Sequence, residues 1–142
     1  MSWLDERIAE ANTLAMRSAL IEEHATAVYE SLWSEIKAKI EEAKTKGFSG
    51  LMTNGRPTAR KIILPDVVPA LGRTLSAPRE IMVELRKSEQ SVVTTGAKQL
   101  SFVLDVCEDG VVCLKFGENS VTVERAAELI ITPLLFPELQ KP

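Results

Sequence analysis

The sequence predicts an α+β protein of one domain, and three observations support this prediction. The first 46 of its 142 residues contain no glycine and no proline, although the remaining residues hold seven of each. From residue 81 onward, apolar and polar residues alternate as they do in half-buried strands. A buried-helix pattern then runs to Thr132-Pro133, where proline ends or kinks a helix. We therefore expect a long N-terminal helix at 1–46, an irregular connector at 47–80, and an antiparallel meander of three or four strands plus a C-terminal helix at 81–142.

The N-terminal helix is predicted by its composition and by the glycine that follows it. Residues 3–46 are rich in alanine, glutamate, lysine and leucine, which favour helix most, and Gly47 stands where helices prefer to end. One unbroken helix would run about 65 Å, whereas a globule of this size is roughly 40 Å across. The helix must overhang its domain, fold back on itself or lie against another chain. The sequence leaves open whether a bend near Glu22-Glu23-His24 divides it.

Apolar and small residues recur along this helix at intervals of four and three, in a stripe of heptad type with a second row beside it. In the second half, Leu32 and Trp33 are expected to dock the helix onto the sheet. The first half is the predicted association face, which consists of Leu4, Ile8, Ala11, Leu14, Ala15 and Ile21.

The connector is interrupted by glycines and prolines. Asn54-Gly55 is a hairpin turn pair, but Pro57 close behind it argues against a regular ladder. We expect a loop-rich segment with one edge strand at 61–64. The predicted core instead draws on the later strands and the C-terminal helix: Ile81, Val83, Leu85, Phe102, Leu104, Val106, Val112, Leu114, Phe116, Leu129 and Ile130.

The register of the hairpin formed by residues 100–107 and 111–116 can be predicted. A three-residue loop, Glu108-Asp109-Gly110, places Leu104 opposite Leu114 and makes every pair on that face apolar, whereas a two-residue turn mixes apolar with charged positions. The chosen register sets Cys107 and Cys113 diagonally, with Cβ atoms roughly 7 Å apart. Since a disulfide needs about 4 Å, two free thiols are expected.

No catalytic constellation is present in the sequence. His24 is the one histidine, and its neighbours one helical turn away are apolar and include no nucleophile. No CxxC or HxxxH spacing, calcium loop or glycine-rich phosphate loop occurs. We expect no metal, no cofactor and no catalytic residue. The favoured function is self-association as a homodimer, or binding of a protein partner, through helix-to-helix burial of the association face.

Two alternatives stay open. The second face of the hairpin is too apolar for solvent and too charged for a closed core, which suggests a ligand pocket or an enzyme site between sheet and helix near Asp105, Cys107 and Cys113. The basic segment 56–87 is the other candidate, although residues 49–101 contain no aromatic ring for nucleic-acid stacking, which disfavours nucleic acid. Its candidate anion contacts are Arg56, Arg60, Lys61, Arg73 and Arg79.

Charge and hydropathy bear on the compartment. The net charge is −3, so the whole molecule is not a polyanion binder. No run of about 18 apolar residues is present, and acids stand at the N-terminus where a signal peptide needs bases. We therefore expect a cytoplasmic protein that does not bind membranes.

Overall fold

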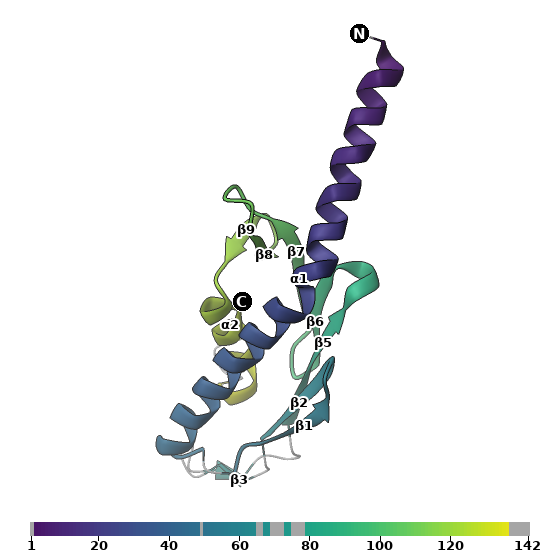
Figure 1. Ribbon diagram of the computed structural model, residues 1–142. Helices are drawn as coiled ribbons and strands as arrows, with labels where there is room; N and C mark the ends of the chain where they lie inside the picture. The colour runs from purple at the N-terminus through teal and green to yellow at the C-terminus, as the bar shows by residue number, and fades with distance from the viewer. Residues whose placement is uncertain (1, 49, 65–66, 69–72, 75–78, 137–142) are drawn as a thin grey trace.

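The computed structural model describes residues 2–48, 50–64, 67–68, 73–74 and 79–136, and it confirms the α+β class (Figure 1). Helix α1 spans Trp3–Thr45 and helix α2 spans Val123–Leu135. The strands between them are β1 (Met52–Arg56), β2 (Ala59–Leu64), β3 (Val67–Val68), β4 (Arg73–Thr74), β5 (Arg79–Arg86), β6 (Ser91–Gly96), β7 (Leu100–Val106), β8 (Val112–Phe116) and β9 (Asn119–Val121). A 3-10 turn, η2 (Lys87–Glu89), joins β5 to β6.

Helix α1 is continuous, so the bend left open by the sequence does not divide it. Ser2 caps its N-terminus by accepting the Asp5 backbone N–H at 3.3 Å. At the other end Gly47 has a φ of 111°, a conformation that glycine adopts without steric cost. Both ends of the helix therefore lie where its composition predicted them.

The sheet is larger than the three or four strands predicted. Seven strands pair antiparallel in the order β1-β2-β5-β6-β7-β8-β9, and β3 and β4 form a separate two-stranded ribbon. The expectation that Pro57 prevents a ladder was wrong, because β1 and β2 form a hairpin whose turn is Pro57-Thr58. At a turn the missing N–H of proline removes no ladder bond. The strand expected at 61–64 is present within β2, but it lies between β1 and β5 rather than at the edge.

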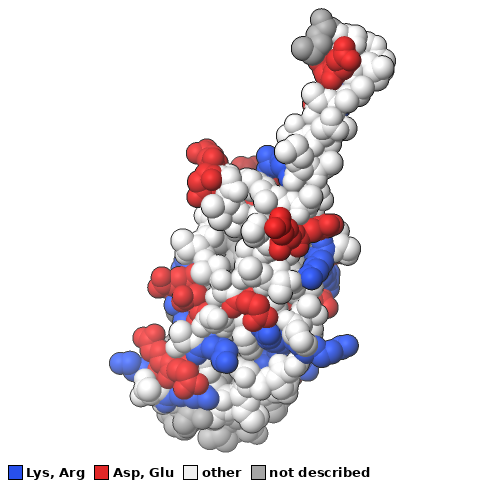
Figure 2. Space-filling model, viewed as in Figure 1, with Lys and Arg blue, Asp and Glu red and all other residues white. Residues whose placement is uncertain are grey.

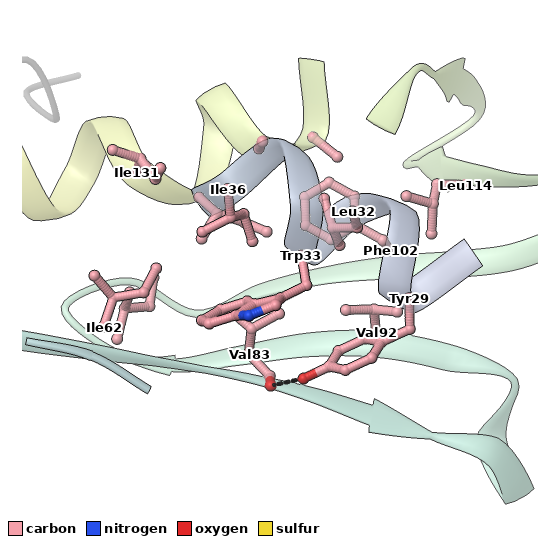
Figure 3. Packing of buried hydrophobic residues seen from close by; sticks show 14 of the residues in the cluster. Tyr29, Leu32, Trp33, Ile36, Ile62, Val83, Val92, Phe102, Leu114 and Ile131 are labelled. Carbon is pink, nitrogen blue, oxygen red and sulfur yellow. Dashed lines mark hydrogen bonds between the residues drawn. The ribbon is translucent and has the colours of Figure 1, made fainter. Parts of the chain in front are cut away.

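Both helices pack on one face of this sheet (Figure 1). Figure 3 shows Tyr29 and Trp33 reaching from α1 toward the strands, where the Tyr29 hydroxyl donates a hydrogen bond of 2.7 Å to the Val83 carbonyl. Leu32 and Trp33 are buried, as expected for residues that dock the helix. The sequence did not point to β2 as a source of core residues, yet its Ile62 and Leu64 are fully enclosed.

The predicted core is largely confirmed. Its buried members are Ile81, Val83, Leu85, Phe102, Leu104, Val112, Leu114 and Ile130. Val106 and Leu129 are half-buried. Phe116 is 37% exposed at the end of β8, where its ring lies 5.3 Å from that of Phe102.

The predicted hairpin register is confirmed, with Leu104 opposite Leu114 and Asp105 opposite Cys113. Gly110 has a φ of 79°, the left-handed conformation expected for a three-residue loop. The prediction of free thiols was wrong, because Cys107 and Cys113 form a disulfide with Cα atoms 6.0 Å apart. The estimate assumed a flat ladder, whereas twist and the bulged loop shorten one diagonal of a hairpin.

Helix α2 begins at the predicted cap, since the Thr122 hydroxyl accepts the Arg125 backbone N–H at 3.0 Å. It continues past Pro133 to Leu135, because proline in a last turn forgoes only one helical bond. Within the described part of the chain, neither helix combines the length and apolar character needed to span a membrane.

Candidate functional site

The N-terminal third of α1 projects from the domain as a single helix (Figures 1 and 2). Every residue from Ser2 to Arg17 is exposed, Ser18 is the first half-buried residue and Ile21 is the first buried one. We call residues 3–17 the stalk. It is the overhang that the length of the helix allowed, and Figure 2 shows it as a narrow rod with acidic side chains near its tip.

The stalk carries large apolar side chains in water. Of the nine large hydrophobic side chains exposed among the described residues, five lie on it: Trp3, Leu4, Ile8, Leu14 and Met16. The exposed fractions of Trp3 and Met16 are 72% and 73%. Scattered single exposures are ordinary in proteins, but five on one projecting element make it a candidate interaction surface.

The predicted association face divides between the stalk and the domain. Leu4, Ile8, Ala11, Leu14 and Ala15 are all exposed on the stalk. Ile21, the sixth member, is only 4% exposed and belongs to the core of the domain. The sequence did not distinguish them because the same apolar spacing runs through both parts.

One face of α1 passes without interruption from the stalk into the domain. We call the row Leu4, Ile8, Ala11, Ala15 and Ser18 the seam; its spacing of four and three continues, after Glu22, through Ala25, Tyr29, Leu32 and Ile36. Those four later residues are buried within the domain. The helix face that is covered in the domain is therefore uncovered along the stalk.

Polar contacts fix the point where the stalk leaves the domain. The Gln90 side-chain amide, at the β5–β6 turn, donates to the Ser18 hydroxyl at 2.8 Å. The Arg17 guanidinium donates to the Asp105 carboxylate, which also pairs with Lys115 at 3.1 Å. The Arg17 hydrogen bond lowers the pKa of Asp105 to about 2, with help from the Val106 backbone N–H. Asp105, predicted as a polar anchor for a ligand, thus anchors the base of the stalk.

A groove of about 500 Å³ lies between α1, the edge of the sheet and the start of α2. On the helix side its wall is formed by His24, Ala27, Val28 and Ser31. The opposite wall, mostly apolar, consists of Gly110, Val111, Val112, Cys113, Leu114, Val121, Thr122 and Val123. The sequence could not reveal this groove, because its walls are far apart along the chain.

The three residues of the predicted ligand pocket are neighbours on β7 and β8, since Cys107 is bonded to Cys113 and Asp105 lies opposite Cys113, but they face different surroundings. Cys113 lines the groove, whereas Asp105 contacts Arg17 and Cys107 lines a second, more polar hollow with Lys115 and Ser120. The sulfur of Cys107 lies 3.6 Å from the Ser120 hydroxyl. Of the three residues, only Cys113 is among those that line the groove between sheet and helix.

Three of the five predicted anion contacts take part in internal interactions. Arg60 lies over the rings of Tyr29 and Trp33, 5.4 Å from each centroid, and donates two hydrogen bonds to Glu30. Lys61 lies 3.5 Å from Glu80, and Arg79 donates to the Pro133 carbonyl at 3.0 Å. Arg56 is exposed on β1 and Arg73 lies in β4, with its side chain outside the described residues.

Within the described ranges, no three or more histidine, cysteine, aspartate or glutamate side chains gather where they could hold a metal ion. Comparison of the chain with protein-family models, curated proteins and solved structures found no match. The stalk, with its seam and the polar contacts at its base, carries five of the nine exposed large apolar side chains of the described residues and is the candidate site.

Proposed function

We propose that the protein self-associates through the stalk and acts as a non-catalytic assembly module. The observation that supports this proposal is a helical segment of fifteen residues with large apolar side chains in water. Isolated helices shorter than about 12–15 residues are marginal in water. Burial of the seam against another helix stabilises such a segment and removes two of the five large apolar side chains, Leu4 and Ile8, from solvent.

A second copy of the chain is the partner that this surface fits. Two identical stalks present the same apolar row, which is what a two-fold interface requires. Ala11, Ala15 and Ser18 are small, so the two helix backbones can approach closely at these positions. The row also follows the heptad spacing along which helices pack side by side.

Light scattering over a dilution series tests the proposal. We expect the wild-type protein to be a dimer that dissociates on dilution, and the double variant Ala11→Glu/Ala15→Glu to be a monomer throughout. The matched control is Ala9→Glu/Thr13→Glu, which adds the same charges at the same spacing on the opposite side of the stalk. A wild-type monomer at every concentration, or a dimer that survives the seam substitutions, would contradict the proposal.

The groove supports a second candidate function, the binding of a small apolar molecule with one hydrogen-bonding group. Its volume of about 500 Å³ is typical of ligand sites, and His24, Ser31 and Thr122 supply polar groups on a mostly apolar lining. Anilinonaphthalene sulfonate fluorescence tests this candidate. Binding should be lost in Ala27→Trp, which fills the groove, and kept in the neighbouring Thr26→Trp; equal binding by both variants excludes the groove.

The cytoplasm expected from the sequence stays a proposal; the Cys107–Cys113 bond counts against it and makes it testable. Cytosolic thiols are kept reduced, whereas oxidising compartments preserve disulfides. Rapid alkylation of intact cells, followed by measurement of the protein mass, distinguishes the two states. Alkylated cysteines support the cytoplasm, and an unmodified disulfide places the protein in an oxidising compartment instead.

A further inference from the structure

We infer that the second copy lies antiparallel along the seam, so that the tip of each stalk reaches the base of the other. This inference rests on the proposed self-association and adds to it the orientation and the residues that meet. Its basis is the continuity of the seam with the helix face that the domain covers.

A parallel pair is excluded by the position of the domain. Beyond Ser18 the seam face of α1 is covered, since Ala25, Tyr29 and Leu32 are buried. Packed helices lie about 8–10 Å apart. Two parallel helices joined along the seam would remain this close beyond the base, where each would need the space that the other copy's sheet occupies.

An antiparallel pair avoids this collision. In that orientation the partner helix begins, at its Ser2 cap, near the point where the seam of the first copy enters the domain. The partner's tip then ends against the η2 turn, which Gln90 attaches to Ser18. The exposed length of the stalk thus matches the length that two copies can share.

The sizes of the seam residues also favour the antiparallel orientation. When the two-fold axis passes beside Ala11, the middle of the seam, Leu4 lies opposite the partner's Ser18, Ile8 opposite the partner's Ala15, and Ala11 opposite the partner's Ala11. Large side chains then face small ones, which keeps the helices evenly spaced and fills the seam. A parallel pair would set Leu4 against Leu4 and Ala15 against Ala15, so that the two helices would be far apart at the tip and close together at the base.

Charge favours the same orientation. The tip carries Asp5 and Glu6, and a parallel pair would bring four carboxylates together there. In the antiparallel pair the tip approaches a base where Arg17 and Lys115 share the single carboxylate of Asp105. The antiparallel orientation therefore separates the two acidic tips, and the two helix dipoles oppose.

Crosslinking of two single-cysteine variants tests the orientation. Asp5→Cys and Ala19→Cys alter exposed positions beside the seam, and a bismaleimide reacts with them but not with the cysteines of the disulfide. Two copies of position 5 lie about 18 Å apart along the axis of an antiparallel pair, which is beyond the reach of a short bismaleimide. With an affinity tag on one variant, we expect crosslinked dimers in the mixture and none in either variant alone.

The outcomes separate the inference from the proposed function. Crosslinked dimers in either variant alone would show a parallel pair, which overturns the orientation and retains association through the stalk. Samples that light scattering shows to be dimeric but that give no crosslink in any mixture would place the interface elsewhere and overturn both. Monomers in all samples would likewise overturn both.

Discussion

Tyr29 lies at the centre of the contact between α1 and the sheet, and its hydroxyl is the polar group that this contact has to satisfy. It is buried and donates to the Val83 carbonyl at 2.7 Å, while Arg60 lies over its ring. Burial raises the pKa of Tyr29 to about 12, against a partial opposing effect of Arg60. The pKa of Tyr29 in the folded state exceeds the value of 10.0 in the unfolded chain. The stabilisation from the buried, neutral Tyr29 hydroxyl is therefore complete below pH 10 and is lost between pH 10 and about 12.

Replacement of Tyr29 by phenylalanine should lower the free energy of unfolding by about 1 kcal/mol, since it removes the hydrogen bond to Val83. Urea unfolding at neutral pH measures this difference. The chain has one tyrosine, so tyrosinate absorbance in the folded wild type reports this residue alone and should rise only near pH 12. Ionisation near pH 10 before unfolding would contradict the buried hydrogen bond.

Asp105→Asn should destabilise the protein at neutral pH but not in acid. The pKa of Asp105 falls from 3.8 to about 2 in the folded state, chiefly through Arg17. Its stabilisation is therefore present above pH 3.8 and is lost as the pH falls toward 2. Thermal unfolding should show a deficit of less than about 1 kcal/mol at pH 7 that disappears at pH 2, with Glu118→Gln as the charge-matched control. A deficit that persists at pH 2 would contradict the ion pair.

The two cysteines show what limits sequence reasoning for single residues. The register that places Asp105 opposite Cys113 followed from matching apolar positions. The same register did not predict how close Cys107 lies to Cys113. Strand twist and the bulged loop bring this diagonal pair near enough for a disulfide bond, which a flat ladder would not. Asp105 was identified as important, but its partner Arg17 is 88 residues away in the chain.

Among the secondary-structure elements, those with a long periodic pattern of apolar residues were predicted correctly. The β1–β2 hairpin was not predicted, because its turn lies at a different position from the one the sequence suggested. Helix α1 and the β7–β8 hairpin were predicted with their ends or register. Asn54-Gly55 was taken for a turn, yet both residues lie within β1 and the turn falls on Pro57-Thr58. With Pro57 read as a barrier to a ladder, β1 was not predicted, and the short strand β9 was missed independently.

Gly96→Ala should cost more stability than Gly110→Ala. Both glycines have positive φ, 104° and 79°, where alanine is strained. A Cβ on Gly96 would in addition collide with the Glu80 carbonyl oxygen on the neighbouring strand β5, whereas a Cβ on Gly110 meets open space. We expect a loss of about 3 kcal/mol for Gly96→Ala and about 1 kcal/mol for Gly110→Ala, measured by urea unfolding. Equal losses would mean that β5 moves aside.

For the whole molecule, the length of α1 left open whether it overhangs its domain, folds back on itself or lies against another chain, and the structure shows an overhang. The same apolar spacing occurs in Leu4–Ala15, which is exposed, and in Ala25–Ile36, which is buried. The boundary at Ser18 is set instead by Gln90 and Asp105, contributed by the distant β5–β6 turn and by β7. Tertiary contacts, which periodicity does not encode, decide where the stalk begins.

Deletion of residues 2–16 should leave the domain as stable as before and abolish self-association. Those residues are exposed and precede the contacts of Arg17 and Ser18. At a dilution where the wild type is monomeric, the two free energies of unfolding should agree within about 0.5 kcal/mol. A larger deficit would show that the stalk supports the fold, and a dimeric truncated protein would show that it is not the interface.

The two tryptophans of the chain lie in different parts of α1, so one can report self-association and the other can report unfolding. Trp3 is 72% exposed near the tip, while Trp33 is 9% exposed among core residues. Acrylamide should therefore quench the emission of Trp3 alone in the monomer, and assembly should protect it. Emission from Trp33 should change only on unfolding. With Trp3→Phe as the reference, a single fluorescence titration resolves assembly from folding in the same sample.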